Sequence, residues 1–142
     1  MKVVLDANII IGFLLTKGYI LSSIFEYWEN NAFKLLVSGS ILEEYSLILK
    51  VLIEKGMLNK QYANSLMRKI RKKALIVKVV TKLKLSPDKK DNRYLECSKD
   101  GKADYLITRD KKHLSFIRKF KYTKIIGAKQ FLEILSGLDY KD

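Results

Sequence analysis

Four acidic residues, far apart in the sequence, each follow an apolar segment that reads as a strand. They are Asp6, Glu44, Asp91 and Asp110. Carboxylate oxygens are ligands that Mg²⁺ and Mn²⁺ prefer in proteins. These ions activate a water molecule and stabilise the attacking and leaving oxygens when a phosphodiester bond is displaced. If the fold brings the four carboxylates together, the sequence predicts a metal-dependent nuclease.

Each of these acids also has a simpler structural explanation. Asp6 and Asp91 could cap the helices that follow them, and Asp110 could cap the turn at residues 111–114. Glu44 could merely favour the positive end of its helix dipole. Taken singly, each acid is better explained in this way. Capping does not explain why all four follow strand ends.

Strand-like and helix-like segments alternate along the chain. The hydrophobic pattern predicts strands at residues 2–5, 33–37, 75–83 and 103–107, with a weaker one at 124–126. It predicts helices at residues 8–15, 19–29, 40–55, 59–73, 91–99 and 128–135. For the third helix, Ser40 and Glu43 fit a capping box and Gly56 provides the stop. The residues 86–88 (Ser-Pro-Asp) interrupt the chain after the third strand.

This alternation predicts an α/β fold with a mainly parallel sheet covered on both faces. We expect one domain spanning residues 1–142. In an open parallel sheet the carboxyl ends of the strands meet at one edge, where ligands bind. The four acids are therefore expected to converge there.

The charge balance suggests the class of partner. The chain has 28 Lys and Arg against 15 Asp and Glu, which gives a formal net charge of +13. Such a bias favours polyanions, nucleic acid ahead of an anionic membrane surface. The alternative is a composition that serves only solubility. Candidate phosphate contacts beside the acids are Lys89, Lys90, Arg109, Lys111 and Lys112.

Other residues narrow the possibilities. The single cysteine, Cys97, cannot form an internal disulfide, which favours a reducing compartment, and the apolar runs are too short to span a membrane. We expect a cytoplasmic protein without a signal peptide. Because His113 is the only histidine, a ribonuclease mechanism with paired histidines is excluded. Cys97 and Trp28 are expected in the core.

Three further polar residues adjoin the predicted site. Asn8 could orient Asp6 or bind a metal-bound water, or simply belong to the first turn of its helix. Thr108 could donate a hydrogen bond to a carboxylate or a water. Asp104 begins its strand and should lie at the opposite end from the other acids, in a structural role, unless the chain bends to bring it near.

Three sequence segments together resemble the PIN-domain nucleases. These are KVVLDANIIIGFLL, SGSILEEY and DNRYLECSKDGKADYLITRDKKHL, and the resemblance covers essentially the whole chain, in order. The resemblance is strongest to the bacterial and archaeal toxins that include VapC-like ribonucleases. It implies a three-layer α/β/α sandwich and assigns the acids to Asp6 in LDAN, Glu44 in LEEY, Asp91 in DNRYLEC and Asp110 in TRD. It also implies Mg²⁺ or Mn²⁺, an RNA substrate, often a homodimer, and a cognate antitoxin.

The chain departs from the family pattern at three positions. Ala7 follows the first acid where Thr is frequent, and Arg109 precedes the last acid where Gly is frequent. Asn92 stands where related sequences often have a second acid. None of these changes removes a principal acid.

The sequence therefore predicts a metal-dependent endoribonuclease, the toxin of a toxin–antitoxin pair. Asp6 and Asp110 are predicted to bind the metal directly, and Asp91 directly or through water. Glu44 is predicted to position or deprotonate the attacking water. The alternatives are a non-catalytic RNA-binding module of the same fold, a metal-dependent phosphatase, and a DNA-directed or flap-type nuclease.

Overall fold

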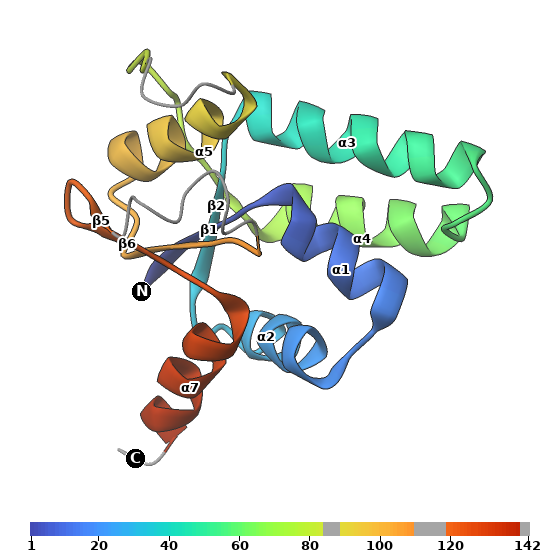
Figure 1. Ribbon diagram of the computed structural model, residues 1–142, viewed down its shortest axis with the longest axis horizontal. Coiled ribbons are helices and arrows are strands. Elements are labelled where there is room, and N and C mark those ends of the chain that lie inside the picture. The colour runs from blue at the N-terminus through green and yellow to red at the C-terminus, as the bar shows by residue number, and fades with distance from the viewer. Residues whose placement is uncertain (84–88, 110–118, 140–142) are drawn as a thin grey trace.

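A mostly parallel sheet forms the centre of the molecule (Figure 1). The computed structural model describes residues 1–83, 89–109 and 119–139, without the side chains of residues 89–91 and 138–139. Within these residues the strand order is β3-β2-β1-β4-β6-β5, and only the β5–β6 pair is antiparallel. The strands are β1 (Lys2–Leu5), β2 (Lys34–Val37), β3 (Leu75–Ile76), β4 (Tyr105–Ile107), β5 (Lys119–Phe120) and β6 (Thr123–Ile126).

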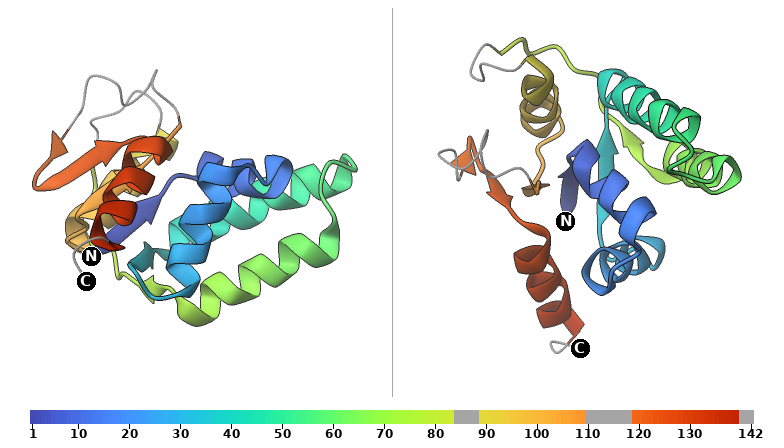
Figure 2. Two further views of the ribbon diagram at one scale, coloured as in Figure 1. Left: turned by 90° about the horizontal axis from the view of Figure 1, so that it is seen from below. Right: turned by 45° about the vertical axis from the view of Figure 1, so that its right-hand side comes forward.

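Helices connect the parallel strands and cover both faces of the sheet, as predicted. They are α1 (Ala7–Thr16), α2 (Tyr19–Glu29), α3 (Gly39–Glu54), α4 (Lys60–Lys73), α5 (Lys89–Asp100) and α7 (Ala128–Asp139). The connections from β1 to β2 and from β2 to β3 run in one direction along the sheet, whereas α5 returns from β3 to β4. Because such crossovers are right-handed, α5 lies on the opposite face from α1–α4 (Figure 2).

The core forms where apolar strands meet the apolar stripes of the helices. In the central strand β1, Val3, Val4 and Leu5 are buried. Along α2 the apolar stripe of Leu21, Ile24, Phe25 and Trp28 is buried. Cys97 is also buried, so both Cys97 and Trp28 lie in the core as predicted.

The start of α3 differs from the prediction. The N-cap is Ser38, whose hydroxyl accepts a hydrogen bond from the Ile41 amide, so the Ser40–Glu43 capping box is wrong. Ser40 and Glu43 are exposed instead. The observed start buries Ile41 and Tyr45, one turn apart, on the side of α3 that faces the core. Packing of this apolar face accounts for the choice between two nearby serines.

The predicted third strand is much shorter than expected. Only Leu75–Ile76 pairs with β2 as a strand, although residues 75–83 were predicted to do so. Two carboxylates of α5 accept hydrogen bonds from backbone amides of the segment that follows β3. Asp100 accepts hydrogen bonds from the Val80 and Thr81 amides, and Glu96 accepts one from the Leu83 amide. These bonds satisfy backbone groups that a sheet ladder would otherwise satisfy.

The register between strands sets the positions of the aspartates. Leu5 lies opposite Ile107 in the β1–β4 pair, so Asp6 and Thr108 follow side by side at the carboxyl edge. At the other end of the same pair, the Asp104 carboxylate accepts a hydrogen bond from the Lys2 amide, at 2.8 Å. Asp104 therefore has the structural position predicted for it, away from Asp6.

No single helix within the described residues is long and apolar enough to cross a membrane. Helices α1 and α2 reach that length and apolarity only as a pair, which is bent by 112° at the break between them.

Candidate active site

Asp6 occupies the turn between β1 and α1. The residue is only 8% exposed and its side chain makes no capping hydrogen bond to α1, so the capping explanation for this residue is wrong. Instead the Asp6 Oδ2 atom accepts hydrogen bonds from the Thr108 hydroxyl, at 2.7 Å, and from the Asn8 side-chain amide, at 3.3 Å. Asn8 Oδ1 in turn accepts from the Arg109 amide. Asn8 and Thr108 thus make the contacts with Asp6 that the sequence suggested.

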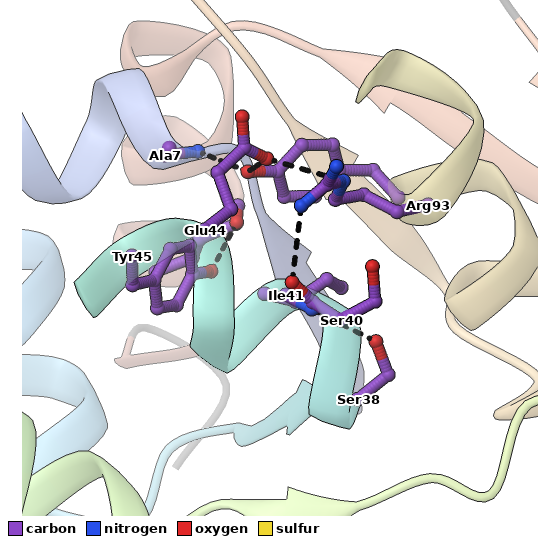
Figure 3. A network of polar contacts seen from close by, with 9 residues as sticks. Ala7, Ser38, Ser40, Ile41, Glu44, Tyr45 and Arg93 are labelled. Carbon is purple, nitrogen blue, oxygen red and sulfur yellow. Dashed lines mark hydrogen bonds and ion pairs between the residues drawn. The ribbon is translucent and has the colours of Figure 1, made fainter. Parts of the chain in front are cut away.

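Glu44 lies in the second turn of α3, at the same edge of the sheet as Asp6. Its Oε2 atom accepts a hydrogen bond from the Tyr94 hydroxyl of α5, at 2.7 Å (Figure 3). The same Tyr94 oxygen accepts a hydrogen bond from the Ala7 amide, at 3.2 Å. Tyr94 therefore connects the Glu44 carboxylate to the residue that follows Asp6.

A second tyrosine joins α3 to β1. The Tyr45 hydroxyl donates a hydrogen bond to the Leu5 carbonyl, the last of β1. Burial, followed by the nearby Asp6 carboxylate, raises the pKa of Tyr45 well above its usual value. Burial also raises the pKa of Tyr94 far above its usual value, and Tyr45, Asp6 and Glu44 add to the shift. Both hydroxyls therefore keep their protons and act as donors.

Arg93 brings a positive charge to this group of acids. Its Nε atom lies 3.4 Å from Glu44 Oε2, and one terminal nitrogen donates a hydrogen bond to the Ser40 carbonyl, at 3.1 Å. The Nε atom is buried and makes no hydrogen bond, so its contact with Glu44 is an ion pair only. Neither Arg93 nor Tyr94 was singled out for the site by the sequence analysis. The signal for Tyr94 is that a buried tyrosine needs a partner for its hydroxyl.

Two of the four predicted acids cannot be placed in full. Asp91 is the third residue of α5, one turn before Tyr94, but its side chain lies outside the described residues. The prediction that Asp91 opens its helix is off by two residues, since α5 begins at Lys89. Asp110, Lys111 and Lys112 lie outside the described residues altogether, as do the side chains of Lys89 and Lys90. Among described residues, no three His, Cys, Asp or Glu side chains form a metal-binding group.

The described part of the site suits a hard divalent cation. It offers carboxylate and carbonyl oxygens but no sulfur or imidazole, which is the donor set of Mg²⁺ and Mn²⁺. Thr108 and Asn8 are neutral donors, and their hydrogen bonds orient the Asp6 carboxylate. Of the predicted metal ligands Asp6, Asp91 and Asp110, the structure describes the side chain of Asp6 alone.

Basic side chains line two hollows in the surface. A cavity of about 580 Å³ beside the start of α3 is lined in part by Lys78, Lys82 and Arg93. Another of about 570 Å³ is lined by Thr108, Arg109 and Lys129, among others. The Arg109 side chain lies against Gly12, where a Cβ would come within 2.3 Å of its guanidinium. Each hollow thus includes at least one residue of the site.

Some basic residues serve the fold instead. Lys69 pairs with Glu29 at 2.6 Å, and Lys73 donates a hydrogen bond to the Glu29 carbonyl. Arg71 donates a hydrogen bond to the Ser46 hydroxyl. The basic surface of α4 is therefore partly occupied by contacts within the protein.

Comparison with known proteins identifies the family. The fold is similar to the crystal structure of PAE2754 from Pyrobaculum aerophilum, with a TM-score of 0.62 and 14% sequence identity, covering 96% of this chain and 99% of that one. None of the curated proteins compared with the chain matches it. A family model described as PIN domain matches residues 2–112, a range that contains all four acids. PIN domains are generally nucleases and typically use divalent metal ions. The chain belongs to the PIN-domain family.

Proposed function

We propose that this protein is an Mg²⁺- or Mn²⁺-dependent endoribonuclease. The observation that carries the proposal is the Asp6 carboxylate, which is buried at the end of the central strand and is not used as a helix cap. Burying a carboxylate costs free energy unless it gains partners. Thr108 and Asn8 are neutral donors that orient this carboxylate, which suits a residue that would hold a cation.

Each residue of the proposed site has a distinct role. Asp6, Asp110 and Asp91 would hold the ion, the last of these directly or through water. The ion would activate a water molecule and stabilise charge on the phosphate. Glu44 would orient that water or accept its proton, and Tyr94 fixes the orientation of the Glu44 carboxylate.

The strongly basic charge of the protein favours a nucleic acid substrate, and the resemblance to the VapC-like group makes RNA the proposed one. A net charge of +13 supplies the attraction for phosphates that the carboxylates lack. The hollows beside Arg93 and Arg109 offer places where the backbone on either side of the cut could lie. Arg109, Lys111, Lys112, Lys89 and Lys90 are the proposed phosphate contacts.

The experiment is cleavage of a labelled single-stranded RNA with Mg²⁺ or Mn²⁺. Asp6→Asn should abolish cutting, and so should EDTA. Asp104→Asn provides a matched control, because Asp104 lies at the opposite end of the same strand pair. The Asn side-chain oxygen can still accept the hydrogen bond from the Lys2 amide. This variant should cut like the wild type.

The outcomes separate the alternatives. Loss of cutting in Asp6→Asn alone supports the proposed site. RNA binding without metal-dependent cutting would favour the non-catalytic module. Metal-dependent cutting of DNA with RNA left intact would favour the DNA-directed nuclease.

We further propose that the protein is a homodimeric toxin held inactive by a cognate antitoxin. This proposal rests on the resemblance to the VapC-like group. Expression of the wild type should then slow the growth of a bacterial host, and expression of Asp6→Asn should not. Equal growth with both proteins would contradict the toxin role, while light scattering would test the dimer.

A further inference from the structure

Glu44 is held through only one of its two carboxylate oxygens. The Tyr94 hydroxyl and the Arg93 guanidinium both approach Oε2. Figure 3 shows the second oxygen turned away from these contacts, and no described residue binds it. The Glu44 side chain as a whole is 12% exposed. The arrangement fixes the carboxylate in one orientation and presents a single oxygen to the site.

Arg93 is itself firmly anchored. Its second contact, to the Ser40 carbonyl, lies one turn earlier on α3 than Glu44. Arg93 thus binds two points of the same helix, and its side chain is only 25% exposed. An arginine stays charged at every physiological pH. A permanent cation is therefore built into the group of acids that is proposed to bind a metal.

We infer that Arg93 is an internal counter-cation, which competes with the metal ion for Glu44 and keeps this carboxylate from binding the ion directly. The inference rests on the proposed function. Like charges repel strongly at short range in a partly buried site, so Arg93 should weaken metal binding. In return, the acids repel one another less when no metal is bound, and Glu44 stays available to act on a water molecule.

A purely structural role for Arg93 predicts the opposite effect on metal binding. If Arg93 only ordered α3 and α5, its loss would loosen the site and weaken the affinity for the ion. If it competes with the ion, its loss should strengthen that affinity. The direction of the change therefore distinguishes the two roles without any measurement of activity.

The experiment is calorimetric titration of the full chain with Mn²⁺ at low ionic strength. Arg93→Gln should bind Mn²⁺ about three- to tenfold more tightly than the wild type. Arg71→Gln is the matched control, since it removes the same charge from a residue that also contacts α3, through Ser46. Ser46 follows Glu44 by two residues and so points to nearly the opposite side of the helix. The affinity of Arg71→Gln for Mn²⁺ should stay within about twofold of the wild-type affinity.

Arg93→Lys separates charge from packing. It keeps the positive charge but loses the planar guanidinium. Its affinity for Mn²⁺ should therefore remain close to that of the wild type.

Two results would overturn the inference. One is an Arg93→Gln variant that binds Mn²⁺ no more tightly than Arg71→Gln. The other is an Arg93→Lys variant that shifts as much as Arg93→Gln. A wild type that binds no Mn²⁺ would instead overturn the proposed function, on which the inference depends.

Discussion

Neutral hydrogen-bond donors contact both acidic side chains of the site that the structure describes, Asp6 and Glu44. Thr108 and Asn8 bind Asp6, and Tyr94 binds Glu44. These two contacts of Asp6 were predictable, because Asn8 is two residues away and Thr108 directly follows the neighbouring strand. Those of Glu44 were not, because Tyr94 belongs to a helix fifty residues further along the chain. The spacing of Tyr94 relative to the apolar residues of the same helix predicts only that Tyr94 lies in the core.

The first prediction concerns the Thr108 hydroxyl. Thr108→Val keeps the shape of the side chain but removes the 2.7 Å hydrogen bond that the Thr108 hydroxyl donates to the buried Asp6 carboxylate. The free energy of unfolding should fall by about 1 to 3 kcal/mol. Turnover of RNA should fall at least about tenfold, because the carboxylate loses its orientation. Urea denaturation and a cleavage assay measure the two effects.

Thr123→Val is the control for Thr108→Val. Thr123 is also buried and donates its hydroxyl to the Ala103 carbonyl, at the end of the sheet away from Asp6. In Thr123→Val the free energy of unfolding should fall by about 1 kcal/mol, and the turnover of RNA should stay at the wild-type level. Equal turnover in the two variants would mean that Thr108 serves stability alone.

At the scale of elements, α5 contributes to both the site and the edge of the sheet. One part of it carries Arg93 and Tyr94, and the following turns carry Glu96 and Asp100, which bind residues 80–83. The sequence placed β1, β2 and β4 well, because their apolar runs are buried on both faces. The strand prediction failed at residues 77–83 because a run rich in Val and Leu indicates a strand. Its composition does not show which groups accept hydrogen bonds from its amides. For Val80, Thr81 and Leu83 these acceptors lie on the next helix, α5.

The second prediction concerns pH. The hydrogen bonds from the Thr81 hydroxyl and amide lower the pKa of Asp100 below its usual value. A lowered pKa means that the carboxylate stabilises the folded state at neutral pH. This contribution is lost as the pH falls through the folded-state pKa. The amides of Val80 and Thr81 should therefore exchange hydrogen faster, relative to the intrinsic rates, under strongly acidic conditions.

Asp100→Asn tests whether this carboxylate is the cause. At neutral pH the amides of Val80 and Thr81 should already exchange faster in this variant than in the wild type. Their remaining protection should then depend less on pH. Unchanged protection in the variant would assign the order of residues 77–83 to other contacts.

At the scale of the whole molecule, a basic protein carries an acidic edge. Parallel topology could be predicted from the alternation of strands and helices, and it implied the convergence of the acids before any geometry was known. The structure describes the side chains of Asp6 and Glu44 at this edge, whereas those of Asp91 and Asp110 stay predictions. The net charge of +13 is spread over many Lys and Arg side chains. Some of these side chains, such as Lys69 and Lys73, form contacts within the fold.

The third prediction is that RNA binding depends steeply on salt. Each phosphate neutralised on a single strand contributes about −0.7 to the slope of log affinity against log salt. Three or more contacts then predict a slope of about −2 or steeper. Fluorescence anisotropy with Asp6→Asn, which should bind without cutting, measures this slope. An affinity that is the same at low and high salt would contradict an electrostatic role for the basic surface.

The most direct test of the metal site is a crystal of the full chain grown with Mn²⁺ and examined by anomalous scattering. The proposed site predicts a peak about 2.1 Å from a carboxylate oxygen of Asp6, with Glu44 outside direct contact. Asp6→Asn crystals treated in the same way should lack this peak. No peak beside Asp6 at saturating Mn²⁺, or a peak only at the opposite end of the sheet near Asp104, would contradict the claim that this edge is a metal-dependent active site.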